Sequence, residues 1–360
     1  MHTARRTHGF TESVIRAMTR VANEHDAINL AQGFPNFPCP DVLKEAATRA
    51  LHADVNQYAI TWGAKRLRDA LARKYADWYR LAVNPEEEIT ITCGATEAMA
   101  AALLAIVDPG DEVIVFEPYY ENYGPDAILC GATPVYVPMA PGAALDLDRV
   151  AAAFSDRTRA IIVNTPNNPT GRVLRRGELE AIAELCRRHD AWAVTDEIYE
   201  HIYYEGEHVP IATLPGMRER TITISGASKT FSVTGWRVGT IVAPAGVTGA
   251  IRKVHDFLTV GAPAPLQEGV AAAIETLGRD YYDGLARDYR ARRDTLMRGL
   301  LAAGFRCTAP EGAYYVLADF TALSDLPDDE FALWLTREVG VAPVPGSSFY
   351  RLPESGRTKL

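Results

Sequence analysis

Cysteine is scarce in this sequence, and the few cysteines present form no pattern. Five cysteines are scattered singly along 360 residues, and no two of them form a CxxC pair. A disulfide framework needs regularly spaced, paired cysteines, and a zinc site needs closely spaced ligands. The sequence therefore supports neither kind of site, no metal ligand is assigned, and the expected compartment is the reducing cytoplasm.

The sequence also lacks the long apolar runs that export and membrane insertion require. Arg5 and Arg6 are not followed by an apolar segment, and no run of about eighteen apolar residues occurs anywhere. Acidic residues outnumber basic ones, which gives a formal net charge of −9 and disfavours a nucleic-acid partner. We therefore expect no membrane partner, no nucleic-acid partner and a small-molecule substrate.

Seven short apolar runs predict β-strands, at Ile89–Thr92, Glu112–Phe116, Thr133–Val137, Ala160–Asn164, Ala191–Thr195, Thr221–Ile224 and Val238–Val242. Helical patterns lie between several of them, at Thr96–Val107, Tyr120–Cys130 and Arg175–His189. Strands that are apolar throughout belong to a mostly parallel sheet that helices cover on both faces. The sequence therefore predicts an α/β fold with a mostly parallel seven-stranded sheet, in which ligands bind beyond the carboxyl ends of the strands.

Outside this alternation the sequence predicts a second, smaller α+β domain, reached through one long helix at Arg279–Gly304. The proline-rich run Ile28–Pro40 is expected to be irregular. Further expected elements are helices at 10–25, 41–52, 64–79 and 328–339 and a strand at 314–319. The expected division is an N-terminal arm at 1–27, a small domain at 28–41 and 277–360, and a large domain at 42–276.

The stretch Ser225–Gly239 places one lysine, Lys229, among small and hydroxylated residues, with Arg237 eight positions later. A lysine that forms a Schiff base needs a partly desolvated site that lowers its pKa, and an arginine supplies fixed charge for a nearby anion. Taken alone, a lysine in such a loop is more often a solvated side chain. Groups at the other strand ends decide between these interpretations.

Two other strand ends carry groups that suit an anionic ligand. Gly94, Ala95 and Thr96 open a helix, so their amides and the Thr96 hydroxyl would face an anion at its positive end. The alternative there is a simple N-cap by Thr96. Asn168 lies in the polar, proline-rich segment at 164–171, which follows a later strand. A rigid turn explains the prolines of this segment but not its two adjacent asparagines, Asn167 and Asn168.

Asp196 and Tyr199 follow a further strand and lie three residues apart, on one side of a helical turn. Asp196 alone could merely cap a helix. Together with an anion cradle, an amide, an arginine and Lys229, it matches a pyridoxal phosphate site, in which an aspartate holds the pyridine nitrogen protonated and a lysine binds the aldehyde. The cofactor predicted from these residues is pyridoxal 5′-phosphate.

With these residues in place, the sequence resembles the class I, fold-type I pyridoxal-phosphate-dependent aminotransferases, from about residue 10 to its last residue. Three segments resemble the kynurenine, glutamine and methionine aminotransferase branch in particular. They are Gln-Gly-Phe-Pro-Asn-Phe-Pro at 32–38, Pro-Glu-Gly-Ala-Tyr-Tyr at 310–315 and Val-Pro-Gly-Ser-Ser-Phe-Tyr at 344–350.

The resemblance implies a role for each site residue. The catalytic residues would be Lys229, which binds the cofactor covalently, Asp196, which pairs with the ring nitrogen, and Tyr199. Further cofactor contacts are implied at the ring 3-oxygen for Asn168 and Tyr199, at the ring face for Tyr120, and at the phosphate for Gly94, Ala95, Thr96 and Arg237. Substrate contacts are implied for the amide of Gly33 and for Asn168. Tyr58 would reach the phosphate of a neighbouring subunit, which implies a homodimer.

Two departures from the family stand out. Many relatives have a phosphate-binding serine three residues before the lysine, where this sequence has Gly226; Ser228 is assigned to the cofactor, with Ser225 as the alternative. Family members also continue into a strand whose arginine binds the substrate α-carboxylate, and then into a last helix. This sequence stops at Leu360, so we expect the small domain to lack both elements, with Arg357 as a weak substitute for that arginine.

The implied reaction is amino-group exchange between an L-amino acid and a 2-oxo acid by a ping-pong mechanism through a Schiff base at Lys229. Two alternatives stay open: β-elimination from cysteine conjugates at the same site, and a cofactor-binding protein of little activity. A pyridoxal-phosphate-dependent transcription regulator would need a basic DNA-binding module, for which the sequence has no spare segment. Tyr123, Trp62 and Phe349 could shape an aromatic or thioether pocket, or could equally be core residues.

Overall fold

The computed structural model describes residues 2–139 and 145–360, and a seven-stranded sheet forms its centre. The strands stand in the order β2-β8-β7-β6-β5-β3-β4, with β8 antiparallel to both neighbours and every other neighbouring pair parallel. The predicted sheet is therefore confirmed. Its strands are β2 Ile89–Thr92, β3 Glu112–Glu117, β4 Thr133–Pro138, β5 Thr158–Asn164, β6 Trp192–Asp196, β7 Thr221–Gly226 and β8 Gly239–Val242.

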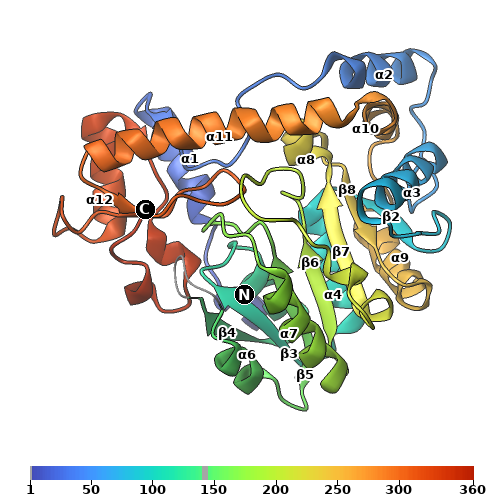
Figure 1. Cartoon of the computed structure of the whole chain (residues 1–360), viewed down its shortest axis with the longest axis horizontal. Coiled ribbons are helices and arrows are strands. Elements are labelled where there is room, and N and C mark those ends of the chain that lie inside the picture. Colours follow the sequence, from blue (N-terminus) through green and yellow to red (C-terminus); the bar gives the residue numbers. More distant parts are fainter. Residues whose placement is uncertain (1, 140–144) are drawn as a thin grey trace.

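Helices surround this sheet (Figure 1). Those of the described residues are α1 Val14–Glu24, α2 Asp41–His52, α3 Lys65–Tyr79, α4 Ala95–Ile106, α5 Tyr123–Leu129, α6 Leu147–Ala153, α7 Arg176–Arg188, α8 Ala227–Thr230, α9 Ala245–Thr259, α10 Ala264–Thr276, α11 Arg279–Ala302 and α12 Asp328–Trp334. No helix in this described part of the chain is long and apolar enough to cross a membrane.

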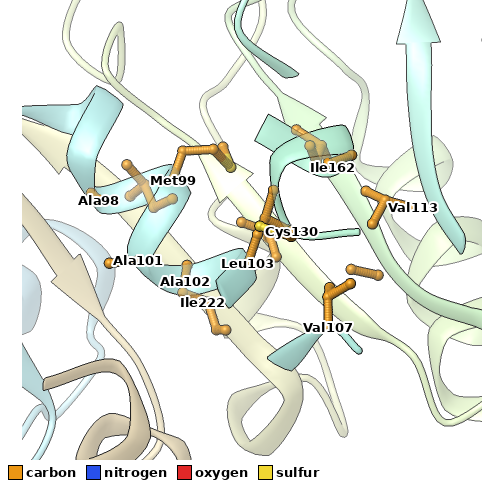
Figure 2. Packing of buried hydrophobic residues seen from close by; sticks show 14 of the residues in the cluster. Ala98, Met99, Ala101, Ala102, Leu103, Val107, Val113, Cys130, Ile162 and Ile222 are labelled. Atoms are coloured by element: carbon orange, nitrogen blue, oxygen red, sulfur yellow. The ribbon is translucent and has the colours of Figure 1, made fainter. Parts of the chain in front are cut away.

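Both faces of the sheet are buried because its strands are apolar on both sides. In β3, Val113 and Val115 belong to one cluster of buried residues, and Ile114 and Phe116 belong to another on the opposite face. α4, α5 and α9 cover the first face, and Figure 2 shows the alanine-rich side of α4 within that cluster. α6 and α7 cover the second face. The predicted cover on both faces is therefore confirmed.

The β2–β8 edge of the sheet is closed by α2, α3 and α10, which bury Leu43, Leu67 and Val270 in a third cluster. From this side of the molecule, α11 runs as one long helix toward α12 and the C-terminus (Figure 1). The single long helix that the sequence predicts here is confirmed.

A smaller α+β part lies at the far end of α11 and contains two short sheets. β1 (Ile28–Asn29) pairs in parallel with β11 (Val341–Ala342), and β9 (Arg306–Cys307) pairs antiparallel with β10 (Ala318–Asp319). α12 continues into a π-helical turn at Leu335–Val339.

Three predicted elements differ from the structure. The strand expected at 314–319 is wrong for its first four residues, because only Ala318 and Asp319 pair with another strand. The run from Ile28 to Pro40 is not irregular throughout, since its first two residues form β1. The helix expected from Tyr120 begins at Tyr123, which leaves Tyr120 in the loop after β3.

Candidate functional site

The carboxyl ends of the strands border a cavity of about 450 Å³. Its lining includes ten of the twelve site residues that the sequence predicts: Gly33, Ala95, Thr96, Tyr120, Asn168, Asp196, Tyr199, Ser228, Lys229 and Arg237. Gly94 adjoins the wall, because a Cβ placed on it would lie 2.1 Å from Arg237 Nη2. Tyr58 does not line the cavity, and its side chain is 85% exposed.

The sheet topology explains why residues far apart in the sequence meet there. Tyr120, Asn168, Asp196 and Lys229 lie at or just beyond the carboxyl ends of β3, β5, β6 and β7, which are mutually parallel and end at one edge. Arg237 instead precedes β8. Because β8 runs antiparallel to its neighbours, its start lies at that same edge.

The amino end of α4 offers uncapped backbone amides to this cavity. Its N-cap is Gly94, with φ of 87°, and no side chain caps the helix, so the alternative of an N-cap by Thr96 is wrong. Arg237 lies beside these amides, where its Nη2 donates to Cys93 O at 3.3 Å. The Gly94 amide donates to Thr92 O at 2.8 Å, which leaves the amides of Ala95 and Thr96 free of partners among the described residues. Free amides at the positive end of a helix, next to a guanidinium, suit a phosphate group.

Lys229 lines the cavity, and its Nζ donates a hydrogen bond to the carbonyl oxygen of Gly33 at 2.6 Å. Burial lowers the pKa of Lys229 to about 8; the Asp196 charge raises it, and the Arg237 charge lowers it. A pKa close to neutrality leaves part of the amine uncharged under ordinary conditions. An uncharged amine is what covalent attachment to an aldehyde and proton transfer both require.

Asp196 is buried and held at both carboxyl oxygens. Oδ2 accepts a hydrogen bond from Tyr123 OH at 2.8 Å, and Oδ1 accepts one from the Ile198 amide at 3.2 Å. Burial raises the pKa of Asp196, whereas these two donors oppose the rise. Asn164 Nδ2 donates to the backbone carbonyl of Asp196 at 2.9 Å. A fixed, buried carboxylate of this kind suits a protonated ring nitrogen.

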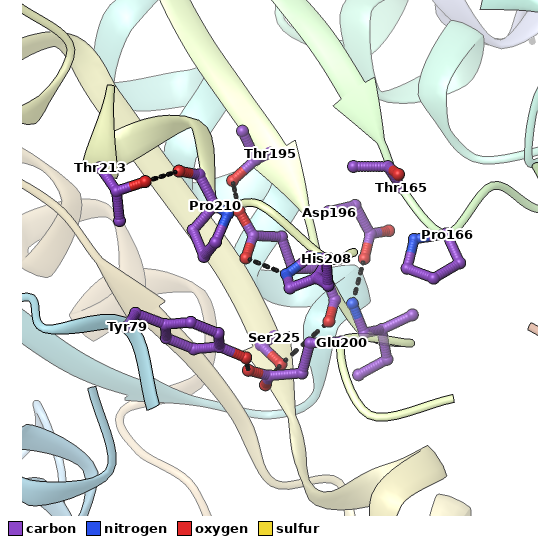
Figure 3. Close-up of polar contacts among 12 residues, drawn as sticks. Tyr79, Thr165, Pro166, Thr195, Asp196, Glu200, His208, Pro210, Thr213 and Ser225 are labelled. Carbon is purple, nitrogen blue, oxygen red and sulfur yellow. Dashed lines mark hydrogen bonds and ion pairs between the residues drawn. The ribbon is translucent and has the colours of Figure 1, made fainter. Parts of the chain in front are cut away.

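A second buried carboxylate, Glu200 (Figure 3), follows Asp196 by four residues. Glu200 does not line the cavity. It accepts hydrogen bonds from Tyr79 and from Ser225 Oγ, the latter at 2.6 Å, and pairs with Lys74 at 2.6 Å. Burial raises and the Lys74 charge lowers the pKa of Glu200, with a net result well below its usual range. Ser225 is therefore committed to Glu200, and Ser228 is the serine that lines the cavity.

Tyr314 and Tyr315 are residues of this site that the sequence reasoning missed. Tyr315 OH lies 2.8 Å from Tyr199 OH, and Tyr314 OH donates to Gly33 O at 3.0 Å. The two tyrosines stand in the segment at 310–315 that carries the family resemblance, but the strand predicted there would turn them to opposite faces. Their contact with the site also explains Gly33, since a Cβ at that position would lie 2.1 Å from Tyr315 Oη.

Three charged residues of the cavity wall, Arg16, Glu121 and Asp126, were likewise not singled out from the sequence. Arg16 lines the cavity from α1, and within residues 2–139 and 145–360 its guanidinium forms no ion pair or side-chain hydrogen bond. Asp126 lines it from α5, is buried, and has no hydrogen-bond partner for Oδ2 in this described part. Burial raises the pKa of Asp126 to about 7.

Of the three aromatic residues considered for a substrate pocket, only one lies at the cavity. Tyr123 lines the cavity, whereas Trp62 and Phe349 do not. Trp62 packs against the guanidinium of Arg252, and Phe349 is buried in the core of the smaller α+β part. Arg357, considered as a substitute for the carboxylate-binding arginine, is exposed and does not line the cavity either.

Comparison with known proteins decides the family, because the model for aminotransferase class I and II matches residues 25–360. The chain belongs to the class I and II aminotransferases. It is 40% identical over 351 residues to a probable N-succinyldiaminopimelate aminotransferase of Mycobacterium tuberculosis, covering 96% of this chain and 88% of that protein. It is 36% identical to human kynurenine–oxoglutarate transaminase 1, covering 97% and 90%. A solved structure of N-succinyldiaminopimelate aminotransferase from Mycobacterium tuberculosis matches with a TM-score of 0.96 at 39% identity, covering 99% and 94%.

This aminotransferase depends on pyridoxal phosphate. Its cavity fits that cofactor. The uncapped end of α4 and Arg237 suit the phosphate, buried Asp196 suits the ring nitrogen, and Lys229 suits the aldehyde. The predicted branch is confirmed, since kynurenine and methionine aminotransferases are among its relatives. Neither β-elimination nor an inactive cofactor-binding protein gains support from these relatives.

Proposed function

We propose that at least one substrate of this aminotransferase carries a second carboxylate, and that Arg16 binds it. The observation that carries the proposal is that the guanidinium of Arg16, in the cavity wall, forms no ion pair or side-chain hydrogen bond within residues 2–139 and 145–360. Glu121, an acid on the same wall, already accepts hydrogen bonds from Ser13 Oγ at 2.6 Å and from the amides of Val14 and Ile15. The positive charge of Arg16 is therefore left for a ligand.

The names of two relatives support this substrate class. One is named for oxoglutarate and one for an N-succinylated diaminopimelate, and both compounds carry a carboxylate besides the one at the reacting carbon. Arg16 and Arg237 are the arginines that line the cavity within the described residues. With Arg237 beside the phosphate cradle, Arg16 is the residue suited to an acidic side chain.

Substrate preference tests this proposal. Loss of a charge-assisted hydrogen bond costs about 1.5–3 kcal/mol, so Arg16→Ala should lower kcat/KM for glutamate and 2-oxoglutarate by about one to two powers of ten. Values for methionine and alanine should change little. Arg20→Ala is the matched control, because Arg20 lies one turn further along α1 and already pairs with Glu12 at 2.7 Å.

Other results would overturn the assignment. An equal fall for all four amino and oxo acids would assign Arg16 to the α-carboxylate that they share. No fall for any of them would remove Arg16 from substrate binding altogether.

We propose the following roles for the predicted site residues. When bound, pyridoxal phosphate supplies an aldehyde that bonds to amines and a ring that takes up the electron pair of a breaking Cα–H bond. Lys229 Nζ takes the proton from the substrate Cα as a general base and would then donate it, as a general acid, to the carbon that carried the cofactor's aldehyde. Asp196 holds the proton on the ring nitrogen, and Asn168 and Tyr199 hydrogen-bond the ring oxygen.

Chemical labelling tests the assignment of Lys229. Borohydride reduction of the purified enzyme should fix the cofactor irreversibly on Lys229, and peptide mapping by mass spectrometry should find it there. A label on another lysine, or no label after pyridoxal phosphate is added, would contradict these roles.

We propose that the enzyme is a homodimer in which Tyr58 completes the site of the partner subunit. Tyr58 and Phe257 are 85% and 92% exposed, which is unusual for such large apolar side chains. The loop of Tyr58 contacts α9, because Thr61 O and His255 Nε2 lie 2.8 Å apart. These exposed aromatic residues therefore belong to neighbouring segments beside the phosphate cradle, where a second subunit can cover them.

Complementation between two damaged variants tests this arrangement. Lys229→Ala and Tyr58→Ala homodimers should each be impaired, and subunit exchange should restore activity, because one site of the mixed dimer then has both residues intact. If Tyr58 served its own subunit, mixing would restore nothing. Sedimentation that finds a fully active monomer would also refute the proposal.

We propose that the domain division stays as the sequence predicts, with a large domain at 42–276 and a small domain at 28–41 and 277–360. A separate buried cluster around Ala332, Val344 and Phe349 supports the small domain, and it includes Met18 from α1. The arm at 1–27 is therefore expected to bridge the two domains, because Ser13 Oγ also donates to Glu121 of the large domain at 2.6 Å; hydrogen exchange can test whether both contacts protect it.

A further inference from the structure

His255 is a fully buried histidine on α9, and it does not line the cavity. Its Nδ1 lies 3.0 Å from Glu97 Oε1 in the first turn of α4, and its Nε2 lies 2.8 Å from the carbonyl oxygen of Thr61. Thr259 Oγ1 is a further neighbour of Nδ1, at 3.3 Å. One imidazole ring thus joins three segments that are far apart in the sequence.

Both ring nitrogens face oxygen atoms that accept hydrogen bonds. A neutral imidazole can donate from only one nitrogen, so the contacts to the Glu97 carboxylate and the Thr61 carbonyl are satisfied together only by the imidazolium ion. Burial lowers the pKa of His255, but the hydrogen bond and charge of Glu97 and the hydrogen bond to Thr61 O raise it, and with the charge of Asp256 the net shift is upward. Asp256, on the same helix, also favours the cation, and the pKa of the nearby Cys93 thiol is raised by burial, which keeps that thiol neutral.

The ion pair lies directly behind the groups assigned to the cofactor phosphate. Glu97 Oε2 accepts a hydrogen bond from the amide of Cys93 at 2.9 Å, and Cys93 O accepts one from Arg237 Nη2 at 3.3 Å. Cys93 also precedes Gly94, the N-cap of α4. The imidazolium therefore fixes, through Glu97 and Cys93, both the uncapped amides and the guanidinium of the cradle.

The second acceptor of His255 extends the connection to another segment. Thr61 lies in the loop between α2 and α3, three residues after the exposed Tyr58. Holding the Thr61 carbonyl fixes the base of this loop against α9. The same buried charge thus aligns the phosphate cradle of one subunit and the loop that we propose reaches the partner's phosphate.

We propose that His255 is a positioning residue for the cofactor phosphate, acting as a buried cation that ties the start of α4 and the Tyr58 loop to α9. The inference rests on the proposed roles of Gly94, Ala95, Thr96 and Arg237 at the phosphate. It assigns His255 no contact with cofactor or substrate. Its effect is to keep donors on three segments aligned, which lowers the cost of ordering them when the phosphate binds.

The test is the affinity of the full-length apoprotein for pyridoxal phosphate and for pyridoxamine phosphate, which has no aldehyde and so does not bond to Lys229. His255→Gln carries no charge and places both of its N–H donors on a single amide nitrogen, so it cannot reproduce the two contacts that the imidazolium makes from separate ring nitrogens to Glu97 and Thr61. Affinity for both compounds should fall by about tenfold or more, the loss expected for one charge-assisted contact. His189→Gln is the matched control, because His189 comes just before β6, at the amino ends of the parallel strands, whereas the cavity lies at their carboxyl ends.

The pH profile separates positioning from a merely structural role. The imidazolium is present below the folded pKa of His255, which lies above the usual 6.5, and is lost as pH rises through it. The parent's affinity for pyridoxamine phosphate should therefore decline across that range, and the His255→Gln variant should lack this step. Glu97→Gln keeps the shape of the pair and should move the step to lower pH, which provides a second variant if the first fails to fold.

Distinct outcomes separate this inference from the proposed function. If borohydride fixes no cofactor on Lys229 of the parent enzyme, the proposed site roles fail. If the parent is labelled normally, but His255→Gln lowers the melting temperature while affinity and its pH profile match the parent, the positioning role fails. Equal losses in His255→Gln and in the His189→Gln control would also overturn it.

Discussion

Replacement of Tyr123 by phenylalanine isolates the hydrogen bond that holds the buried carboxylate of Asp196. Tyr123 OH donates to Asp196 Oδ2 at 2.8 Å, and both side chains are buried. Phenylalanine keeps the aromatic ring, which packs edge-on against Tyr120 with ring centroids 5.7 Å apart. The variant should therefore differ from the parent mainly in the electrostatics of Asp196.

The size of the effect follows from the kind of contact that is lost. A hydrogen bond to a buried carboxylate stabilises its ionised form by about 1.5–3 kcal/mol, and one pKa unit corresponds to about 1.4 kcal/mol. Loss of the hydroxyl should therefore raise the pKa of Asp196 in the apoprotein by about one to two units. This rise adds to the one that burial already causes.

The loss of stability has a defined dependence on pH. The folded pKa of Asp196 lies above its ordinary value of 3.8, so the folded state binds more protons, and stability falls as pH rises from that value through the folded pKa. In Tyr123→Phe the folded pKa of Asp196 is higher, so stability keeps falling with rising pH over about one to two further pH units. The variant should match the parent at acid pH and be about 1.5–3 kcal/mol less stable where both carboxyls are ionised.

Urea unfolding of the two apoproteins between about pH 5 and pH 9 measures this difference directly. The free energies of unfolding of the parent and of Tyr123→Phe should separate as pH rises, and the difference between them should then stay constant. A difference that is the same at every pH would show that the hydroxyl does not distinguish the protonation states of Asp196, and it would refute the reasoning.

Two further changes test other parts of the site. An amine-directed reagent should modify Lys229 of the apoprotein at a rate that reaches half its maximum near pH 8. Burial lowers the pKa of Lys229 to about 8, and only the uncharged amine reacts. Mass spectrometry of the modified peptide measures this rate. Gly239→Ala should weaken cofactor binding strongly and cost about 1–3 kcal/mol of stability. A Cβ there would lie 2.3 Å from the carbonyl carbon of Gly94 and 2.7 Å from the amide nitrogen of Ala95, so β8 and the cradle must separate; pyridoxal phosphate titration and urea unfolding measure both effects.

Each of these expectations has a clear contrary result. A half-maximal rate near 10.5, the ordinary lysine value, would show that Lys229 is solvated in the apoprotein. Gly246→Ala is the control for Gly239→Ala, because Gly246 lies in α9 with no atom within 4 Å of its added Cβ. Equal cofactor affinity in both glycine variants would show that the close approach of β8 to Gly94 does not shape the cradle.

Much of the sheet and the position of the site could be predicted from the sequence. Runs such as Val113–Phe116 mark strands that are buried on both faces, and strands of that kind form parallel sheets whose carboxyl ends share one edge. Asn168, Asp196 and Lys229 each follow such a run, so they could be placed together before any contact was known. These inferences need only local patterns and a rule of topology.

The partners of those residues could not be predicted, because they come from distant parts of the chain. Tyr123 lies 73 positions from Asp196, and locally it looks like any core tyrosine. Tyr315 lies in an apolar segment that favours a strand, yet in the structure it is not part of a strand and its hydroxyl contacts Tyr199 OH. Arg16 lies on a polar helix whose sequence gives no sign that one side chain lines a cavity.

The sequence by itself determined the order of the elements, their apolar faces and the chemical groups available at each strand end, because these depend on residues close together along the chain. Only the tertiary structure decided which groups meet and in what charge state. It turned Ser228 toward the cavity and Ser225 toward Glu200, lowered the pKa of Lys229 by burial, and set His255 between Glu97 and Thr61. A pKa depends on the exclusion of water and on charges brought from distant segments, and neither is written in local composition or spacing.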